Sequence, residues 1–197
     1  MLKSMKQLQA ETNDKLKERK INRDSDGRII LNMDVINDDD FLSRFSLGEK
    51  PIISNDVADF LDSATSYYLP KEQYNLKINS NCIDENEKKI YPSAINEYYT
   101  RAYVDNERII KRNFISSILL GIVGVILLAV MITLEIHNKS VIAIEIIDIA
   151  AWVFLWECFD IAFLENKVLK IKRMRYLAMQ HMKVEFNPLS VDKKTSE

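Results

Sequence analysis

The chain has 197 residues, of which 28% are charged, and its formal net charge is −2. This length allows one modest domain with additional segments, and a near-neutral chain has no basic face for a nucleic-acid partner. The charge is unevenly distributed, because residues 113–134 contain no Asp, Glu, Lys or Arg. Cys82 lies in a polar stretch and Cys158 in an apolar one, so we expect free thiols in a reducing compartment rather than a disulfide.

The first part of the chain predicts a helix, a turn and a strand. Residues 2–20 form a thin amphipathic pattern that lacks the apolar region of a cleavable signal peptide. Residues 22–33 partly match a calcium-binding EF-hand loop, but Met33 stands where that loop needs a bidentate glutamate. We therefore expect a tight turn at Asp26–Gly27 that starts a strand over residues 28–36, and no metal site.

The next stretch predicts the remaining elements of a small α+β domain with a short sheet. Ser54 has the character of a helix N-cap, and residues 74–80 can form a second strand. Asp84 and Glu87 have the spacing of a capping box, and the helix that begins there should break or kink at Pro92 before it continues. Core packing or a protein contact is the expected role of its tyrosines, which are Tyr91, Tyr98, Tyr99 and Tyr103.

The longest apolar stretch, residues 114–134, predicts a transmembrane helix. At ~1.5 Å per residue it spans ~31 Å, which matches the ~30 Å hydrocarbon core of a bilayer. Ser117, Gly121 and Gly124 are small residues that would let another helix approach closely. After a short turn, residues 141–164 predict a second membrane helix that returns through the bilayer.

The second predicted membrane helix carries carboxylates along one side. At about 100° per residue, its acidic and aromatic residues gather in one sector, with one glutamate at the margin, and the opposite side is apolar. Lipid cannot satisfy a carboxylate, so this sector should face protein or water. We call it the acidic stripe, and its residues are Glu145, Asp148, Trp152, Trp156, Glu157 and Asp160.

Three arrangements would satisfy the acidic stripe. In the first, it faces the first membrane helix or sister subunits, and Asp160 lies near Arg112. In the second, several copies turn their stripes inward and attract cations, as acidic rings do in channels. In the third, the segment lies on the membrane or is re-entrant. Because the first helix has few polar groups of its own, we expect a homo-oligomer.

Basic residues flank the predicted membrane segments on one side. The positive-inside rule therefore predicts a multi-pass protein of the cell (cytoplasmic) membrane with both termini in the cytoplasm. A basic helix over residues 165–186 would extend the second membrane helix or lie at anionic headgroups of membrane lipids. The basic residues expected at the membrane surface are Arg108, Lys111, Arg112, Lys167, Lys170, Lys172, Arg173 and Arg175.

These patterns predict an α+β protein with three parts. Residues 1–112 form a small cytoplasmic α+β domain with a helical lead-in. Residues 113–164 form a transmembrane helical hairpin, and residues 165–197 form a basic cytoplasmic helix with a flexible tail.

The segment from Trp152 to Glu157 (WVFLWE), with Asp160 and the basic helix after it, resembles uncharacterised bacterial membrane proteins that have two transmembrane helices and a small N-terminal cytoplasmic domain. The lead-in at residues 106–113 (NERIIKRN) adds to the likeness, which extends over about residues 24–186. The resemblance implies a protein of the bacterial inner membrane. It brings no known activity and no site residue.

The sequence contains no motif of a nucleotide-binding, hydrolase or metalloprotease site. We therefore expect no catalytic residue, no cofactor, no metal and no enzyme activity. The favoured hypothesis is a membrane-anchored scaffold or regulatory protein whose cytoplasmic domain binds a protein partner. The alternative is an oligomeric cation channel or sensor that uses the acidic stripe.

Overall fold

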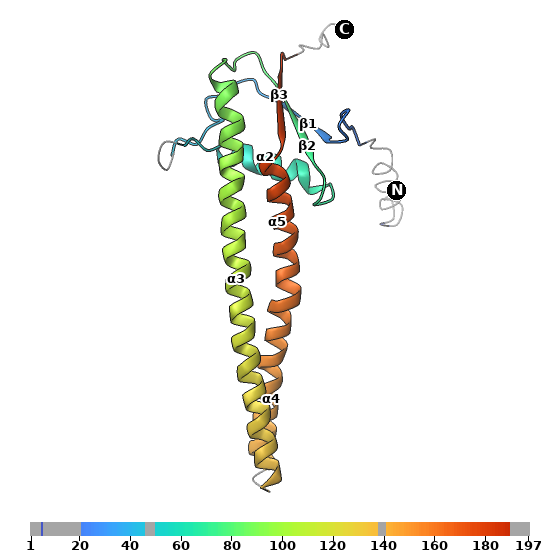
Figure 1. Cartoon of the computed structure of the whole chain (residues 1–197), viewed down its shortest axis with the longest axis vertical. Helices are drawn as coiled ribbons and strands as arrows, with labels where there is room; N and C mark the ends of the chain where they lie inside the picture. Colours follow the sequence, from blue (N-terminus) through green and yellow to red (C-terminus); the bar gives the residue numbers. More distant parts are fainter. Residues whose placement is uncertain (1–4, 6–20, 46–49, 138–140, 190–197) are drawn as a thin grey trace.

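The computed structural model describes residue 5 and residues 21–45, 50–137 and 141–189. Apart from Met5, the helix predicted for residues 2–20 lies outside these ranges. In chain order the elements are β1 (Ile29–Asp34), α2 (Asn55–Ser66), β2 (Tyr74–Asn79), α3 (Glu87–Ile136), α4 (Val141–Phe159), the π-helix η1 (Asp160–Glu165), α5 (Asn166–Gln180) and β3 (Lys183–Asn187) (Figure 1).

The three strands form one parallel sheet in the order β1-β2-β3. Parallel neighbours need a crossover connection, which α2 supplies between β1 and β2. Between β2 and β3 the crossover is the whole segment from α3 to α5. The register pairs Leu31 with Leu76 and Leu76 with Val184, so apolar residues of all three strands share one face.

The apolar face of the sheet packs against α2, the start of α3 and the end of α5. Ser54 caps α2 as predicted, because its hydroxyl accepts a hydrogen bond from the amide of Val57 at 3.4 Å. The helices bury residues at helical spacing in this core, and these include Leu61 of α2, Tyr99 of α3 and Met179 of α5. The sheet and the three helix segments therefore form one hydrophobic core.

The turn before β1 is the predicted one. Gly27 adopts the left-handed conformation with φ of 79°, and its amide donates to the carbonyl of Asp24 at 3.0 Å. The Asp24 carboxylate accepts from the amides of Asp26 and Arg28, both at 2.9 Å, as a turn-forming aspartate does. The structure confirms a turn in front of a strand.

Helix α3 is continuous over 50 residues. The predicted capping box is present, because the Asp84 amide donates to Glu87 Oε2 and the Glu87 amide donates to Asp84 Oδ1, each at 2.7 Å. Of the break or kink predicted at Pro92, the break is absent, because α3 runs through this residue. Pro92 is inside α3, in its second turn, so α3 lacks at this point the one hydrogen bond that an N–H would donate to the carbonyl of Lys88.

The predicted fold class is wrong in its membrane part. Helix α3 is the one helix of the described ranges that is long and apolar enough to cross a membrane, with a mean hydropathy of 2.9 over its best 18-residue window and 11% of that window buried. Helix α4 fails the same test, because it holds Glu145, Asp148 and Glu157. A single span candidate thus replaces the predicted two-helix hairpin, and the expected helix over residues 141–164 changes to a π-helix at Asp160.

The predicted fold class is also wrong in its connectivity. The sheet is parallel with helical crossovers, which is not the segregated arrangement of an α+β domain. The basic helix expected over residues 165–186 ends at Gln180, and Lys183–Asn187 forms β3. Val184 and Phe186 alternate with polar residues, and this pattern lets the segment pair with β2.

Candidate functional site

Helix α3 and the α4–η1–α5 segment lie side by side and project from the sheet as one long pair (Figure 1). Small residues form the contact between α3 and α4. A Cβ atom at Gly121 would lie 3.1 Å from Cys158 Sγ, and one at Gly124 would lie 2.8 Å from two carbon atoms of Leu155. Ser117 is buried on the same side of α3. These small residues therefore let α3 approach α4 closely, as the sequence predicted for a neighbouring helix.

The acidic stripe faces away from α3. The side chains of Trp152 and Trp156 are 63% and 67% exposed, whereas Ala151 of the same helix is fully buried. Glu145 and Glu157 are exposed, and Asp148 and Asp160 are half-buried. In the residues that the structure describes, no ion pair joins Asp160 to Arg112, and the four carboxylates form no hydrogen bond or ion pair. One chain alone thus leaves these carboxylates to water or to another molecule.

Two asparagines connect α3 to η1 and α5 next to the apolar part of the pair, and a third, Asn166, bonds within the η1–α5 segment. Asn106 Nδ2 donates to the carbonyl of Leu169 at 2.9 Å, and Asn113 Nδ2 donates to Glu165 Oε2 at 3.0 Å. Asn166 is 5% exposed and donates to the carbonyl of Ala162 at 3.4 Å. Sequence reasoning missed this contact, although the seven-residue spacing of Asn106 and Asn113 places them on one side of the helix.

The predicted basic residues lie along α3 and α5, between the sheet domain and the apolar end. Arg173 Nη1 forms an ion pair with Glu107 Oε1 at 3.0 Å, which links α5 to α3. Arg108 pairs with Asp105 at 3.2 Å, and Arg175 Nε is buried without a partner. The other members of the set are exposed, and these are Lys111, Arg112, Lys167, Lys170 and Lys172.

A cluster of tyrosines joins α2, α3 and α5 inside the sheet domain. Tyr99 is fully buried, and its hydroxyl donates to Asp62 Oδ1 at 3.0 Å. Its ring contacts Tyr98 edge-on at 5.2 Å and Tyr176 at 6.2 Å. Burial raises the pKa of Asp62, and burial together with the Asp62 carboxylate raises the pKa of Tyr99. Tyr99, like the buried Tyr91, has the core role that the sequence left open.

The second face of the sheet is polar and partly open to solvent. One row across the strands consists of Asn32, Lys77 and Glu185, and the next contains Asn79, whose Nδ2 donates to Asp34 Oδ1 at 2.7 Å. Most of these side chains are exposed or half-buried. Parallel sheets are usually covered on both faces, so a polar face that the described elements leave partly open is a candidate contact surface.

Among the described residues, no group of three or more His, Cys, Asp or Glu side chains is placed to hold a metal ion. Comparisons with known protein families, with curated proteins and with solved structures found no significant match to the chain.

Proposed function

We propose that the protein is a membrane-anchored scaffold or regulator whose sheet domain binds a protein partner in the cytoplasm. The observation that supports it is the continuity of α3. Tyr91 and Tyr99 in the first part of this helix belong to the core of the sheet domain, whereas its last part is apolar and exposed. An exposed apolar helix end is costly in water, and burial in lipid removes that cost. Domain and anchor therefore share one continuous helix.

The pairing of β2 with β3 supports a cytoplasmic location for the whole domain. The segment from α3 to α5 leaves the sheet after β2 and returns to it at β3, so both of its ends lie on the same side of any membrane it enters. Basic residues of α3 and α5 flank this side, among them Lys111, Arg112, Lys167 and Lys170. By the positive-inside rule this side is the cytoplasm.

The polar face of the sheet is the surface that we assign to the partner. It combines amide, carboxylate and ammonium groups on a rigid support, which suits hydrogen bonding to another protein. Asn32 represents this face, because it is exposed in the middle of edge strand β1.

Photo-crosslinking in native membranes tests both parts of this proposal. A photoreactive amino acid replaces Asn32 on the polar face, Ile126 on the exposed side of α3, or Ser66 on α2 as the exposed control. We expect a discrete protein adduct from position 32, lipid adducts from position 126 and neither from position 66. The absence of lipid adducts at 126 would rule out the anchor. If the photoreactive residue at position 32 gives the same protein adducts as the one at position 66, the partner surface is ruled out.

An oligomeric cation channel or sensor is the second candidate. It is favoured by the outward direction of the acidic stripe, whose carboxylates have no hydrogen bond or ion pair among the described residues, since lipid cannot satisfy a carboxylate. Contact between copies would shield the stripe and gather its carboxylates.

The mass of the detergent-solubilised protein, followed by cation flux into vesicles, checks this candidate. We expect several copies per particle and a flux that falls when Glu145 and Asp148 are replaced with Gln and Asn. Thr133→Ser on α3 is the matched control. A monomeric particle, or a flux that the two replacements leave unchanged, would exclude the channel.

A further inference from the structure

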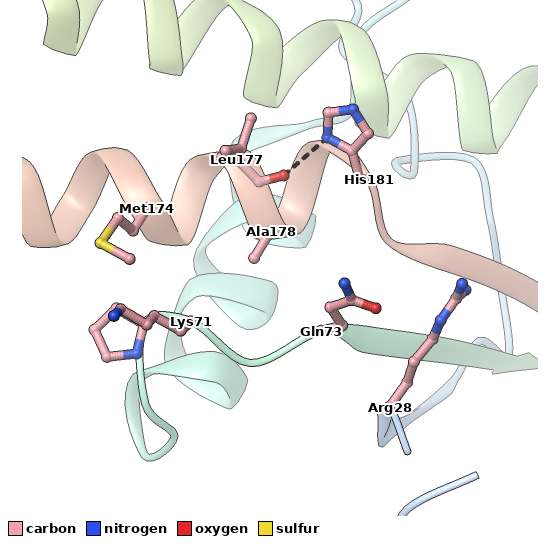
Figure 2. Close-up of a pocket in the computed structure, with 8 residues that line it drawn as sticks. Arg28, Lys71, Gln73, Met174, Leu177, Ala178 and His181 are labelled. Atoms are coloured by element: carbon pink, nitrogen blue, oxygen red, sulfur yellow. Dashed lines mark hydrogen bonds between the residues drawn. The ribbon is translucent and has the colours of Figure 1, made fainter. Parts of the chain in front are cut away.

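A groove of about 730 Å³ lies between α5 and the loop that leads into β2 (Figure 2). Arg28, Gln73 and His181 lie toward one end of it, and Lys71 and Met174 lie at the other. Leu177 and Ala178 of α5 line the wall between them, and Leu177 is partly exposed. The groove thus combines an apolar wall with cationic and amide groups from three separate segments.

The groove has cationic side chains without a direct partner among the described residues, and Asp24 is the carboxylate that attracts Arg28 electrostatically. In the described residues, the side chains of Arg28 and Lys71 form no ion pair or hydrogen bond. The neighbouring carboxylate of Glu72 is already held by Arg23 through two contacts of 2.8 Å. His181 Nδ1 lies 3.1 Å from the carbonyl of Leu177, so its Nε2 remains available to a ligand.

We propose that this groove binds a soluble small molecule that carries a phosphate or carboxylate group on an apolar body. Its volume falls within the ~300–1,000 Å³ of small-molecule sites. The guanidinium of Arg28 and the amide of Gln73 are donors for the anionic group, and a charged donor makes the stronger bond. Met174 and Leu177 cover the apolar body of the ligand.

The distance of the groove from the apolar part of the helix pair favours a soluble ligand over a lipid headgroup. This argument rests on the proposed membrane anchor. Met174 is ten residues beyond Leu164, an exposed apolar residue at the end of the apolar part. At ~1.5 Å per residue this separation is ~15 Å. The headgroup layer adds only ~5–7 Å to each side of the hydrocarbon core, so it ends below the groove.

Equilibrium dialysis of the full chain in zwitterionic lipid nanodiscs tests the site, with empty nanodiscs as background. The probe is 1-naphthyl phosphate. The competitors are 1-naphthol, which has only the apolar ring system, and inorganic phosphate, which has only the anionic group. We expect saturable binding that 1-naphthol and phosphate displace only at much higher concentration. Arg28→Gln should weaken binding at least tenfold, and Leu177→Glu should also weaken it through charge repulsion. Arg44→Gln, at an exposed arginine outside the groove, should leave it within twofold.

Three outcomes would overturn the proposal. These are no saturable binding, binding that both groove variants leave unchanged while circular dichroism shows them folded, and binding that 1-naphthol displaces as well as the probe itself does. Binding that disappears when the nanodiscs contain anionic lipid would assign the groove to a headgroup and overturn the soluble ligand. The first three results do not bear on the anchor or the partner surface, which the photo-crosslinking experiment decides.

Discussion

Replacing Tyr99 with alanine should lower the free energy of unfolding of the sheet domain by about 3–5 kcal/mol, the range for a large aromatic removed from a core. Tyr99 is fully buried and contacts two other helices, α5 through the ring of Tyr176 and α2 through Asp62. Its loss also leaves the Asp62 carboxylate without the hydroxyl that donates to it. Thermal unfolding of the detergent-solubilised chain, followed by near-ultraviolet circular dichroism, measures the effect.

Two further variants separate packing from the hydrogen bond. Tyr99→Phe keeps the ring and removes only the hydroxyl, so it should cost about 1–3 kcal/mol and less than alanine does. Leu69→Ala, at a side chain that is 70% exposed, should stay within about 0.5 kcal/mol of the parent. Equal losses for Tyr99→Ala and Leu69→Ala would contradict the buried position of the tyrosine.

Gly124→Ile should force α3 and α4 apart, at a cost of about 3 kcal/mol. A Cβ atom added at this position would lie 2.8 Å from Leu155 Cγ and Cδ2 and 3.3 Å from the backbone nitrogen of Leu155. Because one of these contacts is to the backbone, rotating the Leu155 side chain alone cannot make room for isoleucine. Cys158 lies in the same contact, against Gly121. We therefore expect its thiol to react faster with a maleimide in the Gly124→Ile protein.

The measurement uses a Cys82→Ser background, because Cys82 is the other, exposed thiol. Val125→Leu is the matched control, since Val125 is the neighbouring residue and its side chain is 59% exposed. The control should leave both the thermal stability and the labelling rate of Cys158 unchanged. A Gly124→Ile protein with the labelling rate of the control would show that the helices do not pack through this glycine.

Local signals in the sequence predicted much of the fold correctly. The capping box at Asp84 and Glu87, the turn at Gly27 and the first two strands depend on neighbouring residues, and all are present. The apolar part of α3 was also identified, because residues 114–134 contain no charge or proline that would interrupt it.

Features that depend on distant partners were not predictable in this way. The five residues of β3 are compatible with the end of a basic helix, and only their pairing with β2 makes them a strand. The periodicity of α4 defined the acidic stripe, but it cannot say which side of the helix meets α3. The groove was missed because Arg28, Gln73 and His181 come from three segments that meet only in the folded chain.

The position of β3 in the sheet has a consequence for the order of folding. Asn187 contacts Asn79 across 108 positions of sequence, and the whole α3–α5 segment lies between them. Ribosomes add ~5–20 residues per second, so β2 waits on the order of 5–20 s for its second neighbour. Until then one edge of β2 is unpaired and the end of α5 is missing from the core. The sheet can be completed only after the α3–α5 segment has been synthesised and has returned to β2. A complete three-stranded sheet therefore forms only in chains whose apolar helix pair has already been made.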